Sequence, residues 1–152
     1  MRATMVYLSI IFLLLDVLLA SVEKKSLVTC VSECWYQIKW AHYALLALAA
    51  LMMLPPMLEC TPDNWQFLAF IACASLVFVA TAPSYLEKFE GRVHSISAIL
   101  CAACAIAWAA VVVPVALIGC ALLIVAAFDK THRLLWLELS AFSTAYIGVI
   151  LL

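Results

Sequence analysis

The sequence predicts an all-α integral membrane protein: a single transmembrane domain formed by a bundle of six transmembrane helices, with an interfacial helix between the first and the second. Hydrophobic residues make up 69% of the 152 residues and charged residues only 11%, whereas soluble domains are about half apolar and about a quarter charged. The apolar residues form runs long enough to cross a hydrocarbon core of about 30 Å. The basic residues also fall in alternate connections between these runs, as membrane topology requires.

The first three spans follow from long apolar runs at about residues 3–22, 41–58 and 65–82. The first run has some features of a signal peptide. Its single preceding basic residue, Arg2, and the acidic Asp16 inside the run favour a retained transmembrane helix instead. Residues 26–39 carry apolar side chains at spacings of three and four, which predicts a helix lying along the membrane interface.

A charged segment, residues 84–98, separates the third span from an apolar run at 93–128. As one helix this run would measure about 54 Å, nearly twice what a bilayer needs. Pro114 predicts a break, because proline lacks a backbone donor and restricts the residue before it. The run is therefore divided into spans at about 93–109 and 113–128, and a last span covers about 134–152.

The basic residues set the predicted orientation. Seven of the eight lie in loops one, three and five of the six-span arrangement: Lys24, Lys25, Lys39, Lys88, Arg92, Lys130 and Arg133. The positive-inside rule then predicts a multi-pass protein of the cell membrane with these loops in the cytoplasm and both termini outside. Four tryptophans near the proposed helix ends are expected to form an aromatic belt: Trp40, Trp65, Trp108 and Trp136.

Composition also excludes several classes of partner. A net charge of -1 without a basic, aromatic-rich run argues against nucleic acid. Three glycines without a glycine-rich loop argue against a phosphate-binding cradle, and no cofactor is predicted. The pair Cys101 and Cys104 lies inside an apolar run, where cysteine packs as a small hydrophobic residue.

The candidate functional residues are titratable groups in or beside the spans. A carboxylate inside a membrane is costly and normally has a partner, so Glu138 is a candidate catalytic residue together with Glu33 and His94. Each also has a structural interpretation, as a hydrogen bond or ion pair between helices or as an interfacial cap. We expect Glu138 to pair with His94 or Arg92. Structural or proton-handling roles are assigned to Asp16, Ser32, Arg92 and Ser97.

Recognised catalytic and metal-binding motifs do not occur in the sequence. Zinc needs three or four converging ligands, and no H-x-x-x-H or H-E-x-x-H motif places two histidines on one helical face. No metal site is therefore predicted. A G-x-S-x-G turn, which presents the nucleophilic serine of many hydrolases, does not occur either.

Several fragments resemble a group of short multi-pass membrane proteins of bacteria and phages. They are CVSECWY (30–36), LPPMLEC (54–60), WQFLAF (65–70), EGRVHSISAIL (90–100) and WLELSAFSTAYI (136–147). The family pattern has serine and threonine where this chain has Cys30 and Cys34. More distantly, the loop around Ser32 and Glu33, and His94 at a helix start, are similar to DRAM-like membrane proteins. The resemblance implies a multi-pass membrane protein and no particular activity.

These observations favour a small accessory, interaction or lipid-binding protein over an enzyme. Its expected partners are membrane lipids, another membrane protein or a second copy of the chain. Two alternatives stay open. One is a membrane-embedded hydrolase whose site, at the inner leaflet, contains Glu33, His94 and Glu138. The other is a small oligomeric pore for protons or solutes.

Overall fold

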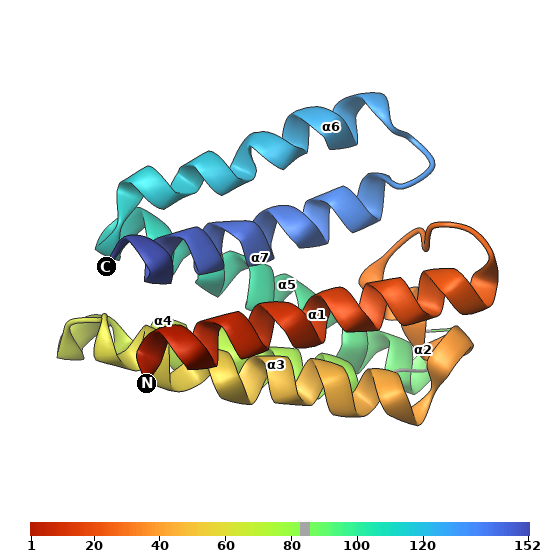
Figure 1. Ribbon diagram of the computed structural model, residues 1–152, viewed down its shortest axis with the longest axis horizontal. Coiled ribbons are helices and arrows are strands. Elements are labelled where there is room, and N and C mark those ends of the chain that lie inside the picture. The colour runs from red at the N-terminus through yellow and green to blue at the C-terminus, as the bar shows by residue number, and fades with distance from the viewer. Residues whose placement is uncertain (83–85) are drawn as a thin grey trace.

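The computed structural model describes residues 1–82 and 86–152, and every regular element in these residues is a helix. The predicted all-α fold is confirmed for this part of the chain. The elements are α1 (Arg2–Lys24), η1 (Val31–Glu33), α2 (Cys34–Ile38), α3 (Trp40–Glu59), η2 (Asp63–Trp65), α4 (Gln66–Thr81), α5 (Lys88–Val112), η3 (Pro114–Ala121), α6 (Leu122–Phe128) and α7 (Arg133–Leu151). Figure 1 shows the long helices side by side, so that the bundle has two ends.

Five helices are long and apolar enough to cross a membrane: α1, α3, α4 with the η2 turn before it, α5 and α7. They coincide with the first four and the last of the predicted spans. Their outward surfaces are apolar as well, since Leu14, Phe70 and Ile99 are each more than half exposed. Such a surface is unfavourable in water, whereas lipid chains are as apolar as these side chains.

The fifth predicted span, 113–128, is a shorter apolar helical segment of a different form. The chain breaks at Val113, directly before the proline that predicts the break, and η3 is then followed by α6. A 3₁₀ helix rises about 2.0 Å per residue and an α-helix about 1.5 Å, so eight residues of η3 and seven of α6 extend about 26 Å. The 3₁₀ form thus brings a short segment close to the thickness of a hydrocarbon core, about 30 Å.

Gly119 allows this segment to lie close against α7, beside which it runs in Figure 1. A Cβ atom at this position would lie 2.5 Å from the backbone nitrogen of Thr144. Helix backbones inside membranes approach this closely where one of the two residues is small. The contact therefore depends on glycine, and it fixes η3 and α6 alongside the last long helix.

Three connections meet at one end of the bundle, and both termini lie at the other (Figure 1). The first connection is tied to α1 by an ion pair of 2.7 Å between Lys24 and Glu33, and to α7 by a hydrogen bond of 3.0 Å from the Leu135 N–H to the Thr29 carbonyl. We call this the basic end, because seven of the eight Lys and Arg residues lie in or beside its connections.

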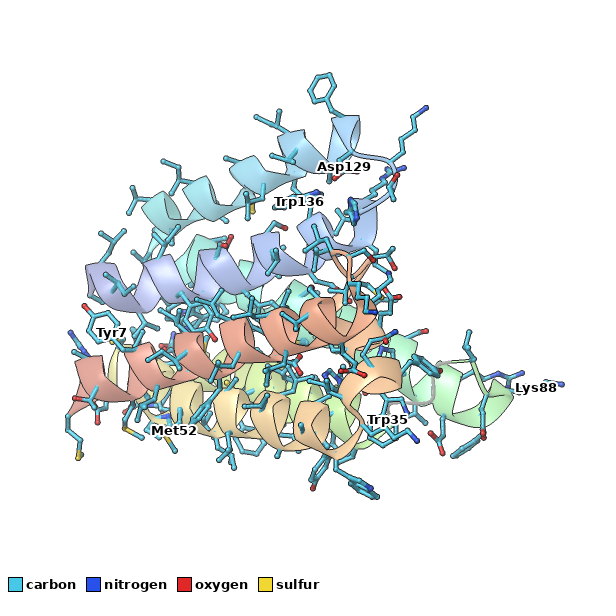
Figure 2. The ribbon with its side chains drawn as sticks, turned by 45° about the vertical axis from the view of Figure 1, so that its right-hand side comes forward. Tyr7, Trp35, Met52, Lys88, Asp129 and Trp136 are labelled. Carbon is cyan, nitrogen blue, oxygen red and sulfur yellow. The ribbon has the colours of Figure 1, made fainter. Side chains whose placement is uncertain are left out.

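Much of the charged segment predicted as a loop is helical. Its first two residues, 84 and 85, lie outside the described residues, as does Pro83, which ends the third predicted span. Helix α5 begins at Lys88, five residues before the predicted start at 93. At about 37 Å its 25 residues exceed a hydrocarbon core by more than one turn. Figure 2 shows Lys88 at the tip of this projecting turn.

The predicted interfacial helix over 26–39 is shorter and more deeply packed than expected. Its helical part is the η1 turn and the five-residue α2, while Val28, Val31 and Cys34 are buried. The apolar spacing does mark one face, but that face packs against the protein and not against lipid. Positive φ angles at Lys25 (60°) and Lys39 (43°) turn the chain at either side of this segment.

Trp108 was expected in an aromatic belt, and this prediction is wrong. The side chain is fully buried in the core, and its indole N–H donates to the Thr61 hydroxyl at 2.6 Å. That hydroxyl donates in turn to the Met57 carbonyl near the end of α3. Position near a helix end does not reveal which way a side chain points. Trp40, by contrast, is exposed. Trp136 donates to Asp129 at 3.0 Å, and Figure 2 shows these two residues close together.

Candidate functional site

Residues 28–34 belong to the first connection, which joins α1 to α3, and they pack into the basic end of the bundle. The backbone N–H of Val31 donates to the Glu138 carboxylate of α7 at 2.6 Å. Together with the Thr29 carbonyl, which accepts from Leu135, this bond fixes the segment against the start of α7. A buried carboxylate needs such a donor, because an unpaired charge in an apolar environment is very costly. Glu138 therefore positions the segment and is itself held by it.

Glu33 stabilises the same segment from its outer side. One carboxylate oxygen accepts from the Thr29 N–H at 2.6 Å and from the Thr29 hydroxyl at 2.9 Å, and the other pairs with Lys24. Burial alone would raise the pKa of the Glu33 carboxyl, but Lys24 and the two Thr29 donors outweigh it and hold the pKa below its usual value. All these bonds are local, so Glu33 acts as a structural clamp.

Ser32 and His94 form a direct hydrogen bond between the first connection and α5. The Ser32 Oγ lies 2.6 Å from His94 Nε2, and His94 Nδ1 lies 3.0 Å from the Ala82 carbonyl. A carbonyl only accepts, so Nδ1 carries the proton, and in the neutral ring Nε2 accepts from the Ser32 hydroxyl. The histidine is thus held in one tautomer with its basic nitrogen facing a serine.

A central cavity runs between the helices next to this segment, and its volume is about 740 Å³ when the open space at its mouth is included. Along α3 it extends from Leu46 to Met57, about 16 Å of helix axis. Ser32 and Glu138 contribute its lining at the basic end, and Tyr146 lies farther along α7. The Tyr146 hydroxyl is bonded to Ser9 at 2.9 Å.

A second buried polar group lies between α1 and α3. His42 Nδ1 is 2.9 and 3.0 Å from the two oxygens of Asp16, and both side chains are fully buried. The Cys34 sulfur belongs to the same group: one ligand atom from each of Asp16, Cys34 and His42 lies within 4.8 Å of the others. His42 Nε2 is buried without a hydrogen-bond partner among the described residues.

The structure brings together most of the residues singled out in the sequence. Ser32, His94 and Glu138 lie in one region. His94 is bonded to Ser32, and Glu138 is bonded to the backbone N–H of the neighbouring Val31. The expected pair of Glu138 with His94 or Arg92 is wrong: Glu138 accepts from Val31, His94 contacts Ser32 and Ala82, and Arg92 is exposed. Ser97 is buried on α5, close to His94 in sequence.

Two site residues were missed by sequence reasoning. In the sequence Cys34 is notable only as a departure from a family pattern, and His42 is not among the candidates, yet both lie beside Asp16. Their separations from Asp16, 18 and 26 residues, match no metal-binding spacing. The usable signal was Asp16 itself, because a carboxylate inside an apolar helix requires a partner from another helix.

No family model, curated protein or solved structure matches this chain. The resemblance to short membrane proteins of bacteria and phages therefore stays a prediction.

Proposed function

We propose that the protein is an integral membrane protein that holds one chain of an amphipathic lipid in the central cavity, with the polar group of the lipid at Ser32 and Glu138. The uneven distribution of oxygen atoms around the cavity carries this proposal. Ser32 and Glu138 both lie at the basic end. Among the described residues, the only other oxygen-bearing side chain in the lining is that of Tyr146, whose hydroxyl is bonded to Ser9. An apolar lining with a few convergent polar groups is the usual form of a ligand site.

The bonds of these two residues indicate which polar group they recognise. The Ser32 hydroxyl donates its proton to His94, so its lone pairs are left as acceptors. The Glu138 carboxyl, which accepts from the Val31 N–H, has further lone pairs that can accept. The site therefore favours a headgroup that donates hydrogen bonds, such as a hydroxyl, amide or ammonium, over a phosphate. Because lipid tails are already in an apolar solvent, this polar contact and close packing supply the selectivity.

The orientation that we propose places the basic end in the cytoplasm, with six spans and both termini outside. The concentration of Lys and Arg at one end supports it, since such residues are enriched in cytoplasmic loops. Reporter enzymes fused after Asn64 and at the C-terminus should then be active outside the membrane, and one fused after Arg92 should be active inside. A cytoplasmic C-terminus would contradict the six-span arrangement.

Lipid retention is expected to depend on open space in the cavity. Ala102 lines the cavity, whereas its neighbour Ala103 is exposed on the outer side of α5. Ala102→Phe should fill the space that the lipid chain occupies and abolish lipid retention, while Ala103→Phe should retain it. Native mass spectrometry of the purified protein, followed by extraction and identification of the bound lipid, measures this. Equal retention by both variants would place the lipid outside the cavity.

The short contact between Ser32 and His94 favours a second candidate, transfer of an acyl group from the bound lipid. A serine hydrogen-bonded to a histidine that is itself oriented by a third group is the arrangement of an activated nucleophile. Ser32 Oγ would attack the acyl carbonyl while His94 takes its proton, and His94 would return that proton to the lipid oxygen or nitrogen that leaves as the acyl bond breaks. Water would then hydrolyse the Ser32 acyl ester. In this scheme Ser32 replaces Glu33 in the predicted hydrolase. A fluorophosphonate probe that labels the protein, but not Ser32→Ala or His94→Ala, supports this chemistry. Wild-type protein that stays unlabelled supports binding alone.

A further inference from the structure

We propose that Asp16, Cys34 and His42 form a binding site for a divalent transition-metal ion such as zinc, enclosed between α1, α2 and α3. This site is separate from the central cavity, whose lining contains none of the three residues. Their ligand atoms already lie within 4.8 Å of one another, and each side chain is fully buried. A carboxylate, an imidazole and a thiolate together suit zinc and similar ions.

The ring nitrogen of His42 that faces Asp16 is the one that would bind the ion. Nδ1 is held between the two oxygens of Asp16, while Nε2 is buried and makes no hydrogen bond to any described residue. Nε2 lies on the opposite edge of the ring, so an ion bound there would be too far from Asp16 to bind it as well. An ion shared with Asp16 therefore binds Nδ1 in place of their hydrogen bond, and the proton of the neutral ring moves to Nε2.

Charge balance also favours a divalent ion in this position. Ionised Asp16 and a Cys34 thiolate carry two negative charges, and with a neutral His42 a divalent cation makes the group neutral. A neutral group avoids the large cost of burying net charge. Burial, and then the charge of Asp16, raise the pKa of the Cys34 thiol well above its ordinary range. The metal must therefore displace the thiol proton as it binds.

Three protein ligands leave the fourth position of a tetrahedral ion to a water molecule or another ligand. Structural zinc sites usually have four protein ligands, and sites with three retain an exchangeable position. Cys34, the first residue of α2, would contribute its ligand atom from the connection between α1 and α3.

Cobalt substitution of the full-length protein in detergent tests the site, because a cobalt–thiolate bond gives a charge-transfer absorption band. The wild-type protein should bind one ion per chain with this band, and zinc should raise its thermal unfolding midpoint. Cys34→Ser should lose the band, and Asp16→Asn should bind the ion at least tenfold more weakly. Cys30→Ser changes another buried cysteine of the same connection and should behave like the wild type.

Two outcomes would overturn the proposal. One is wild-type protein that binds no more cobalt or zinc than Cys34→Ser. The other is binding that Cys34→Ser and Asp16→Asn retain but that the combined Asp129→Asn and His132→Ala variant loses, because the ion would then occupy the partly exposed pair of that loop. If Cys34→Ser fails to fold, the wild-type protein is tested instead. It is unfolded, refolded with or without zinc, and then alkylated. Zinc should then protect one thiol, and absence of protection contradicts the site.

Discussion

Replacing Asp16 by leucine is expected to lower the free energy of unfolding by about 3–5 kcal/mol, because the change leaves His42 buried without its partner. Both side chains are fully buried and lie 2.9 Å apart. Reversible unfolding in mixed detergent micelles, with metal removed by a chelator, measures the loss. The partly exposed pair of Asp129 and His132 offers a matched control, and Asp129→Leu should have a much smaller effect.

A double-mutant cycle separates the hydrogen-bonded pair of Asp16 and His42 from simple loss of packing. When His42 is also replaced by leucine, no polar group is left unpaired, and two apolar side chains often substitute for a buried pair at little cost. The double variant should therefore be more stable than the sum of the two single changes predicts. Strict additivity would show that Asp16 and His42 do not interact.

Replacing Trp108 by alanine should cost about 3–5 kcal/mol, the range found when a buried aromatic side chain is removed from a core. The indole is fully buried and packs against Gly148, where a Cβ atom would lie 2.5 Å from the ring. Its hydrogen bond to Thr61 also joins α5 to the end of α3. Thermal unfolding in detergent and chemical unfolding should both show the loss.

Two further variants divide this effect into its parts. Trp108→Phe keeps most of the packing and removes the N–H donor, so about 1 kcal/mol of the loss should remain. Trp40→Ala, at an exposed tryptophan, should change stability little. If Trp40→Ala were as damaging as Trp108→Ala, the assignment of Trp108 to the core and Trp40 to the surface would be wrong.

The helices could be predicted from the sequence because their length and composition are local properties. Pro114 marks the break between α5 and η3, since the missing backbone donor acts where the proline stands. The close approach of the following segment to α7 was not predictable, because it depends on the contact of Gly119 with Thr144, a residue far along the chain. The direction of Trp108 likewise depends on Thr61, which lies 47 residues away in sequence.

The candidate site was predicted in part for the same reason. Glu138 and Asp16 are conspicuous because a carboxylate in an apolar helix is costly wherever it lies. Their partners are not visible in the sequence: Glu138 is held by the backbone N–H of Val31, and Asp16 by His42. Nearly every residue has a backbone N–H, so residue identity does not reveal which one donates to a carboxylate. The expected ion pair of Glu138 therefore named the wrong partners.

Cross-linking with a bilayer lipid that carries a diazirine near the end of one acyl chain tests the central cavity most directly. The purified protein is irradiated in lipid nanodiscs, and the modified peptides are identified by mass spectrometry. Met53, Met57 and Phe142 line the cavity, whereas Phe70 and Ile99 face outward. A lipid chain held in the cavity predicts adducts at the first three residues that Ala102→Phe removes. Adducts confined to Phe70, Ile99 and other outward-facing side chains would contradict lipid binding inside the bundle.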